Sequence, residues 1–568
     1  MAEFSTTPAQ EVPERFQKYD LEISDPKKTG LRLYTLTDKK TGVAGTFAEF
    51  NPDFDVHAGI AWVGARTSRS SDSYPAIFEE INTAIGAGRY TAGDKLADVF
   101  VNYGHASVAD MAPVMLFFNN IPMHIPFRVF NQMSLGAGQE LSTRYVELTD
   151  LGVPDVGRIF DGFETPEVEL LAQIEWKALQ TQMVENYNKW FERLQPALGE
   201  YLDNNFDGEV KPSTLTTRAL DVARMWIPAG AKTSQTALAS VRQWVDIAGQ
   251  LRINGDVESA EVGNLIIDLL SLGGHPECLD IKANLSALTR HSEGSPTVQD
   301  NVQELREHLG KFGEFQGQQS KIRGIRYPES GSTELILPFE YGSQTMAFNY
   351  ILQAYPEMHP SIVLDFVQDL GEDELREISN IIFKGHNQFD PLRSAADVRG
   401  PAFVYESSLA YMRDINRHRS FGRLVLSLEV EDFNTILDGG WNRNHAIHNA
   451  EYWKQFAEEW EADWAAFYKK FDELRDFLES ELGTNYKPKE MINMLPLGHQ
   501  IRMVLSAPAG QWSYMTSLRV GLGGDFGYRE DVWNMLEALR NSDPGFSGMA
   551  SHLVKPDVNN PGQIVGRS

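Results

Sequence analysis

One short pattern occurs twice along this chain, and this repetition constrains the architecture more than any other feature. Ile227-Pro228 is followed by Gln243-Trp244, and Leu495-Pro496 is followed by Gln511-Trp512 at the same offset. Each run then closes with a leucine–arginine pair, and a Gly-His pair precedes an apolar segment earlier in each half, at 104–105 and 385–386. The shared order predicts an internal duplication, and a repeat of this kind decides the architecture.

The length of 568 residues also requires more than one core. A polar stretch separates two bodies of similar length. We expect an N-terminal arm over 1–30, a first body over 31–289, a connector over 290–332, a second body over 333–550 and a C-terminal tail over 551–568.

Local patterns indicate mostly helical structure. Short β-type runs around DKKTG predict a hairpin between Leu31 and Thr46. Three- and four-residue spacing of apolar side chains predicts helices near 75–103, 166–205, 233–252 and 258–272. NVQELREHLG predicts a helix within the connector, and 450–482 predicts an amphipathic helix with an aromatic face and an acidic face.

Composition excludes several classes of protein. A net charge of −28 and a pI near 4.9 argue against a general nucleic-acid surface, which needs a basic stripe. The sequence has no apolar stretch of membrane-spanning length and no signal-peptide order, so we expect a soluble, cytoplasmic protein with no membrane partner. The single cysteine, Cys278, predicts a buried small hydrophobe.

Two further segments favour structural roles. His445, His448 and Glu451 share one face of a predicted helix, and a solvated face is favoured over a metal site there. GLGGDFG at 521–527 follows a helix instead of a strand, so it predicts a helix end and a hinge instead of a phosphate loop. We therefore expect no metal.

The segment from Gln139 to Tyr145 is the first candidate for chemistry. On an extended chain, alternation would direct Glu140, Ser142 and Arg144 to one side. A hydroxyl beside a guanidinium fork makes a phosphate cradle, whereas the plainer interpretation of Arg144 is a surface ion pair.

The surroundings of this segment resemble the flavin-dependent thymidylate synthase family. Gly104-His105-Ala-Ser107-Val-Ala-Asp110 resembles the family's first motif, with Asp for Glu and Met111 for its second His. Glu140, Ser142, Arg144 and Tyr145 match the end of its second motif. ARMWIPAGAKTSQTALASVRQW resembles a third stretch and places Arg242 on a substrate-contacting arginine. The resemblance covers most of residues 50–275.

The two bodies depart from the family in opposite ways. The first has Gln132-Met133-Ser134 where the family has Arg-His-Arg, with Ala137 and Gln139 at the following Ser and Asn. The second has Arg417-His418-Arg419, followed in register by Ser427. It lacks the phosphate-binding arginine, because Glu429 stands there, and Gly510 replaces the arginine that Arg242 represents. We therefore expect one composite site built from unlike halves.

The resemblance implies an α+β fold of two tandem thymidylate-synthase-complementing-type domains. Each would be a small antiparallel sheet flanked by long helices, and a homodimer would form a pseudo-tetramer. It implies reductive methylation of dUMP to dTMP, with FAD as cofactor and NADPH and methylenetetrahydrofolate as co-substrates.

The implied roles follow the motifs. Ser142, Arg144 and Tyr145 would bind the nucleotide, and Arg242 would face the pyrimidine. Glu140 would orient the arginines, and Arg417, His418, Arg419 and Ser427 would hold the flavin. Two alternatives stay open: a related flavin-dependent pyrimidine-nucleotide methyl- or hydroxymethyltransferase, and a non-catalytic descendant acting in binding or assembly.

Overall fold

The computed structural model describes most of the chain. The described segments are 12–24, 32–49, 110–133, 136–148, 151–278, 297–313, 333–337, 342–384, 400–425, 433–442, 445–542 and 549–566, with a few single residues between them. Gly104, His105, Ser107, the Gly-His pair at 385–386, Ser427, Glu429 and most of the helix predicted near 75–103 lie outside these segments.

The chain forms two compact units, each assembled from separate stretches. Unit 1 contains 1–121, 132–141 and 233–295, and unit 2 contains 122–131, 142–232 and 296–568. The domain boundaries expected from the sequence stay a prediction. They divide the chain into consecutive segments, whereas each compact unit combines stretches from different parts of the chain. In the described part of the chain, no helix is long and apolar enough to cross a membrane.

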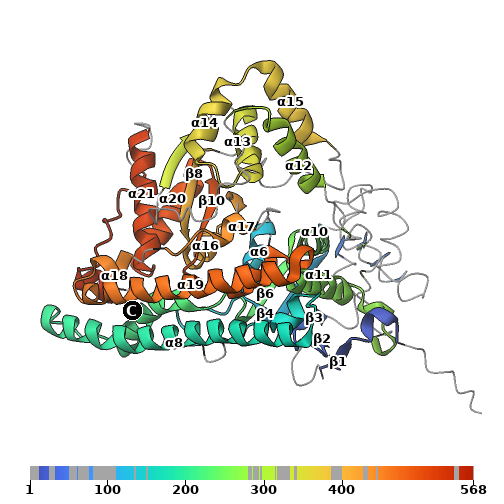
Figure 1. Cartoon of the computed structure of the whole chain (residues 1–568), viewed down its shortest axis with the longest axis horizontal. Helices are drawn as coiled ribbons and strands as arrows, with labels where there is room; N and C mark the ends of the chain where they lie inside the picture. Colours follow the sequence, from blue (N-terminus) through green and yellow to red (C-terminus); the bar gives the residue numbers. More distant parts are fainter. Residues whose placement is uncertain are drawn as a thin grey trace, which may run out of the picture. The chain divides into compact units, whose positions relative to one another are not determined.

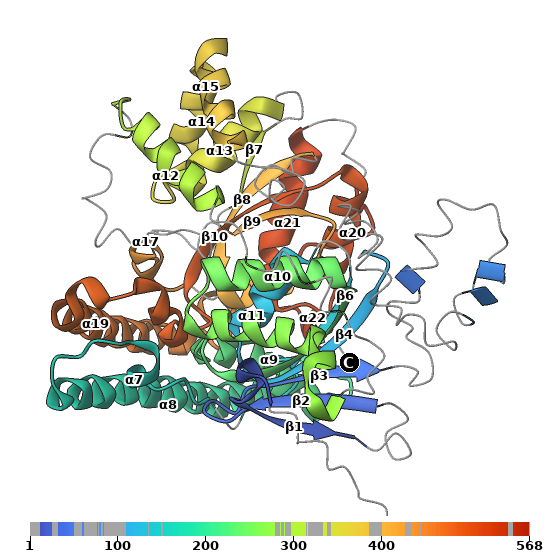
Figure 2. The ribbon, with the colours of Figure 1, turned by 90° about the vertical axis from the view of Figure 1, so that its right-hand side faces the viewer.

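Unit 1 is built on an antiparallel sheet. The strand order is β1-β2-β3-β4-β6-β5. The strands are β1 Tyr19–Ile23, β2 Arg32–Asp38, β3 Ala44–Glu49, β4 Pro113–Pro122, β5 Ala137–Glu140 and β6 Lys232–Ser240. Helices α10 (Val241–Asn254) and α11 (Val257–Leu270) pack against each other, and α11 also contacts β3 (Figure 2).

The predicted hairpin is confirmed. Asp38 Oδ1 accepts the N–H groups of Lys40 and Thr41, and Gly42 adopts a positive φ of 68°, which closes the turn between β2 and β3. Part of the segment predicted to be an N-terminal arm belongs to the sheet, because Tyr19–Ile23 forms β1 and pairs along β2. Cys278 is fully buried, as predicted.

The predicted helix over 233–252 is wrong in its first half. Lys232–Ser240 forms β6, and only then does α10 begin, with the Ser240 hydroxyl accepting the N–H of Gln243 as its N-cap. The side chains of β6 alternate between buried and more exposed positions, which is the two-residue period of a strand. The threonine and serine residues of this segment fit a pleated surface and a helix cap better than a helix interior.

Unit 2 contains the second sheet and the longest helices. Its strands have the order β7-β8-β10-β9 and are β7 Thr333–Leu337, β8 Ala402–Ser408, β9 Gly422–Val425 and β10 Gln500–Ser506. Its first-half helices are α6 His124–Gln132, α7 Val156–Ile159, α8 Pro166–Asn205 and α9 Pro212–Ala223. Its later helices are α16 Leu409–Ile415, α17 Asn434–Leu437, α18 His445–Asn449, α19 Ala457–Leu482, α20 Ala509–Val520, α21 Phe526–Ser542 and α22 Pro561–Val565.

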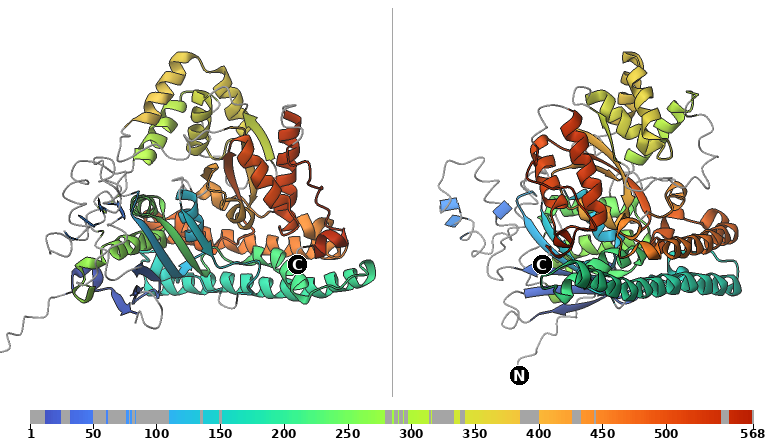
Figure 3. Two further views of the ribbon diagram at one scale, coloured as in Figure 1. Left: turned by 180° about the vertical axis from the view of Figure 1, so that it is seen from behind. Right: turned by 90° about the vertical axis from the view of Figure 1, so that its left-hand side faces the viewer.

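Four further helices form a group of their own within unit 2. They are α12 Thr297–Leu309, α13 Gly342–Ala354, α14 Pro360–Asp369 and α15 Glu372–Phe383 (Figure 3), and they share an apolar core with residues of β8, β9 and β10. The helix α12 confirms the one predicted in the connector.

The helices α8 and α19 run side by side (Figure 1). Thr165 caps α8 and Pro166 occupies its first turn, so the helix begins where the sequence predicts. The aromatic face of α19 is buried, and Trp464 stacks on Trp226 with ring centroids 3.6 Å apart. Because these tryptophans come from different halves, one core spans both halves within unit 2.

Backbone pairing in unit 2 joins the two copies of the repeated segment. The Ala229 N–H donates to the Leu495 carbonyl, and the Leu497 N–H donates to the Ile227 carbonyl, each at 2.7 Å. The two bonds exchange equivalent positions of the repeat, so the two segments pair with each other about a local pseudo-twofold axis.

The strand registers of the two sheets agree with this repeat. In unit 1, Ala137 pairs with Leu238 and Glu140 with Gln235. In unit 2, Gly422 pairs with Ser506 and Val425 with Met503. The second set lies at the positions that the sequence repeat assigns as equivalents of the first. The register therefore supports the predicted duplication.

Candidate functional site

Arg144 lies in a turn and not on an extended strand. β5 ends at Glu140, and the Val146 N–H donates to the Ser142 carbonyl at 3.1 Å. The prediction that Glu140, Ser142 and Arg144 point to one side of an extended chain is therefore wrong beyond Glu140. Arg144 is buried, whereas Tyr145 is 64% exposed.

The guanidinium of Arg144 is fully engaged by unit 2. Its Nε lies 2.7 Å from Asp221 Oδ1, and its Nη2 lies 3.3 Å from Asp221 Oδ2. Nη1 donates to the Tyr528 hydroxyl at 2.9 Å, and Nη2 also donates to the Gly523 carbonyl at 3.1 Å. Burial alone would lower the pKa of Arg144, but Asp221, Tyr528 and Asp414 raise it well above its ordinary value.

Arg144 belongs to a set that we call the buried charge cluster. Its six members are Arg144, Arg218, Asp221, Arg224, Asp414 and Asp525. Arg224 Nη2 lies 3.1 Å from both Asp414 Oδ2 and Asp525 Oδ2. With three cations and three carboxylates the cluster is formally neutral, which a buried set requires.

The pKa values of the two carboxylates bound to Arg224 are shifted in opposite directions. Burial would raise the pKa of Asp414, but Arg224, and then Arg144, Arg519 and Arg417, lower it below its usual range. Burial, and then the neighbouring Asp221, raise the pKa of Asp525 to about 6. Arginines from both halves of the chain thus stabilise the ionised form of Asp414.

The triplet Arg417-His418-Arg419 follows the end of α16. His418 is buried, and its Nε2 lies 2.8 Å from Nε of Arg519, in the last turn of α20. Burial, and then Arg519 and Arg423, lower the pKa of His418 to about 3, so the ring is neutral. Arg417 and Arg419 are half-buried, and burial lowers the pKa of Arg419. Ser427 lies outside the described residues.

Tyr528 lies between the two predicted sets. Its hydroxyl accepts from Arg144, and the guanidinium carbons of Arg144 and Arg519 lie 5.4 and 5.8 Å from its ring centroid. Arg519 in turn donates to His418. Unit 2 therefore brings the predicted nucleotide residue Arg144 and the predicted flavin residue His418 into one connected network, with Ser142 close by in sequence.

Arg242 and Glu140 belong to unit 1. Arg242 Nη1 lies 2.9 Å from Asp110 Oδ2, and the Ser240 hydroxyl donates to Asp110 Oδ1 at 3.3 Å. Asp110 closes the first motif, so this unit joins the first and third motifs of the resemblance. Both partners are more than a third exposed, so the pair contributes little to stability and leaves Arg242 accessible.

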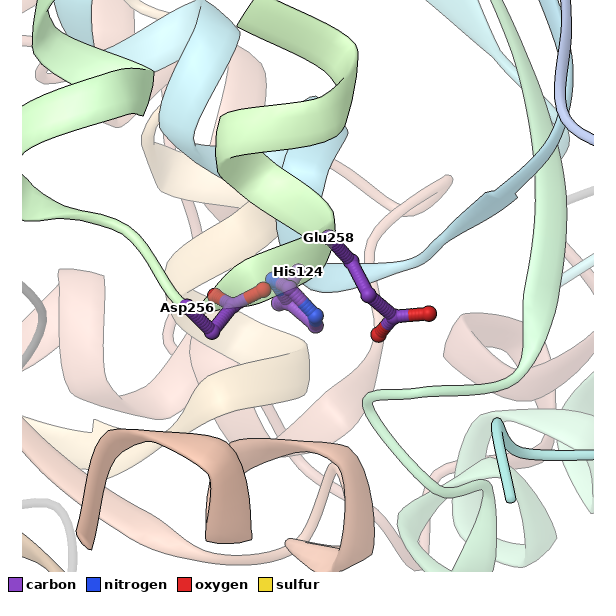
Figure 4. A group of neighbouring side chains, drawn as sticks. All are labelled: His124, Asp256 and Glu258. Carbon is purple, nitrogen blue, oxygen red and sulfur yellow. The ribbon is translucent and has the colours of Figure 1, made fainter. Parts of the chain in front are cut away.

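Polar side chains also mark the starts of two helices. Figure 4 shows Asp256 at the N-cap of α11, Glu258 in the first turn of that helix, and His124 at the start of α6. Asp256 caps α11 by accepting the Ser259 N–H at 3.0 Å. Within unit 2, His124 Nε2 lies 3.3 Å from Asn493 Oδ1, beside the paired repeat segments. These contacts organise the fold.

Sequence reasoning missed most of the buried charge cluster. Arg218, Asp221 and Arg224 follow one another at three-residue spacing within TTRALDVARMW, among apolar residues. That spacing places them on one helix face, and charges flanked by apolar side chains signal buried pairs. The GLGGDFG segment does follow the end of α20 as predicted, but its carbonyls also accept from Arg144 and Arg218, and it carries Asp525.

Comparisons with known proteins point in one direction. Residues 57–270 match the sequence model of the thymidylate synthase complementing protein family. A UPF0159 protein of Thermoplasma acidophilum is 22% identical over 386 residues, which cover 62% of this chain and 70% of the relative.

One solved structure also aligns with the chain. It is a UMP/dUMP methylase, PolB, from Streptomyces cacaoi, bound with 5-Br UMP, and it aligns at 12% identity with a TM-score of 0.27. The alignment covers 45% of this chain and 98% of that one, and a score this low carries no structural argument. The family match thus assigns residues 57–270 of this chain to the thymidylate synthase complementing protein family.

Proposed function

We propose that the chain is an FAD-dependent methyltransferase that converts dUMP to dTMP, with methylenetetrahydrofolate and NADPH as co-substrates. The family match over residues 57–270 supports a nucleotide methyltransferase of this kind. The observation that carries the proposal is the network from Arg144 through Tyr528 and Arg519 to His418. It places residues expected for the nucleotide and for the flavin, which lie in different halves of the sequence, within unit 2.

The residues after α16 fit a phosphate-bearing cofactor. Arg417, Arg419 and Arg519 concentrate positive charge on a chain whose net charge is −28. Burial lowers the pKa of Arg419, and an anion beside it would stabilise its charged form. Arg417 and Arg419 would hold the pyrophosphate of FAD with planar forks. Bound there, the reduced flavin supplies the hydride of the proposed reaction.

The nucleotide would bind through Ser142, Arg144 and Tyr145. Asp221 already accepts from Nε and Nη2 of Arg144, so a nucleotide phosphate at Arg144 must displace this carboxylate or share the guanidinium with it. Arg242, with Asp110 as its partner, would stabilise negative charge that develops on the pyrimidine ring. Glu140 would orient the arginines by ion pairing. Two chains would assemble as a homodimer equivalent to a tetramer of single-copy subunits.

The first experiment is a visible absorbance spectrum of the purified full-length chain, repeated after addition of FAD and then of dUMP. A flavin band that shifts with dUMP supports the proposal, and turnover with the folate and NADPH would follow. UMP and dCMP in place of dUMP separate the related pyrimidine-nucleotide activities. A colourless protein that binds no FAD contradicts the proposal.

One observation favours a second candidate, a non-catalytic binding or assembly protein. Every nitrogen of the Arg144 guanidinium already donates within unit 2, which is the arrangement of a structural arginine. Absence of both FAD and dUMP binding would support this candidate.

A further inference from the structure

The ring of His418 is oriented by one hydrogen bond. Its Nε2 lies 2.8 Å from Arg519 Nε, and it contacts the rings of Phe421 and Tyr514 at centroid distances of 6.0 Å. A guanidinium has only donors, so Nε2 must present its lone pair to Arg519. In a neutral imidazole, the proton then resides on Nδ1.

The surroundings of His418 keep the ring neutral. Besides Arg519, the buried Arg423 also lowers the pKa of His418. Nη1 of Arg423 donates to the Asn416 side chain at 3.1 Å. Both cations disfavour a second proton on the ring, as burial does. Within the described residues, Nδ1 of His418 makes no hydrogen bond, so its N–H is available to a ligand.

The first copy of the repeat lacks this arrangement. The residue aligned with His418 is Met133, and the arginine that closes the first run, Arg252, donates to Asn264 Oδ1 at 2.8 Å instead. An arginine at the end of this helix thus serves packing in unit 1. Of the two copies, the second has the Arg519–His418 pair, and it is also the copy that retains the Arg-His-Arg triplet expected to hold the flavin.

We propose that Arg519 is a positioning residue that fixes His418 as the neutral Nδ1–H tautomer, so that Nδ1–H donates to an acceptor atom of bound flavin. The inference rests on the proposed function and deepens it, because it assigns a donor and the residue that orients it. The arginine acts through the histidine and needs no contact with the flavin.

The test uses the full-length chain labelled with 15N-histidine. The chain has 13 histidines, and the signals of His418 are those that disappear in His418→Gln. In the wild type we expect a protonated Nδ1 and a bare Nε2 between pH 6 and 8. Arg519→Leu should abolish the preference, whereas Arg519→Lys should keep it because an ammonium group also only donates.

FAD titration gives the second readout. Arg519→Leu should weaken FAD binding up to about tenfold, the value of one misplaced hydrogen bond, and Arg519→Lys should restore most of it. The control is Arg252→Leu, at the arginine of the leucine–arginine pair that closes the first run, which should change neither the tautomer nor FAD affinity.

The two hypotheses fail in different ways. A wild-type ring protonated on Nε2, or unchanged tautomer and FAD affinity in Arg519→Leu, overturns the role of Arg519 and leaves the proposed function intact. A wild-type chain that binds no FAD overturns the proposed function, and the donation from Nδ1–H to flavin with it.

Discussion

Arg144 and Asp221 form a buried two-point ion pair, with Nε 2.7 Å from Oδ1 and Nη2 3.3 Å from Oδ2. Asp221→Ala removes the carboxylate that pairs with both Arg144 and Arg218 and leaves the buried charge cluster with a net positive charge, so we expect the free energy of unfolding to fall by about 3–5 kcal/mol. Urea denaturation of the full chain measures this. Asp373→Ala, at the exposed Asp373–Arg376 pair, should stay within about 1 kcal/mol of the wild type. Equal losses in both variants would contradict the buried pair.

Arg144 and Arg419 should affect different ligands. The double variant Arg144→Gln with Asp221→Asn removes both buried charges together, so it avoids leaving one unpaired. We expect it to weaken dUMP binding roughly tenfold or more while FAD content stays close to that of the wild type.

Arg419→Ala should do the reverse, and calorimetry with each ligand separates the two effects. Equal loss of both ligands in both variants would point to misfolding and would contradict the division between the halves.

Asp525 should make stability depend on pH. Its folded-state pKa, about 6, lies above the ordinary 3.8, so folding favours the protonated carboxyl. The stabilisation is complete below about pH 4 and is lost as the pH rises through 6. Asp525→Asn removes this titration and retains an acceptor for the Gly527 N–H. The difference in unfolding free energy between wild type and variant should therefore change between pH 4 and 6, in the variant's favour. A constant difference would contradict the raised pKa.

Gly230 should tolerate no side chain. A Cβ there would lie 2.7 Å from the Asn493 carbonyl oxygen, in the segment where the two copies pair. Gly230→Ala should lower the melting temperature by several degrees, since backbone must move. Gly510→Ala is the matched control, because nothing lies within 4 Å of a Cβ there and α20 would gain a better helix former. If Gly230→Ala melts no earlier than Gly510→Ala, the close pairing is wrong.

The predicted elements succeeded where the local pattern was long and unambiguous. The helix near 166–205 corresponds to α8, and the DKKTG hairpin formed because turn chemistry is local. The segment 232–240 failed because apolar residues at mixed spacing fit a strand as well as a helix, and pairing with β5 decided between them.

The sequence by itself determined the repeat, the family match of its motifs and the opposite losses in the two halves. The tertiary structure decided what these motifs contact. Asp221 lies far from Arg144 along the chain, and Asp525 lies far from Arg224. Folding brings each pair together and removes water from all four side chains, so each buried charge then requires a partner. Burial also keeps His418 neutral, and the fold brings Arg519 to its Nε2; the cost of a buried charge depends on surroundings that no local pattern encodes.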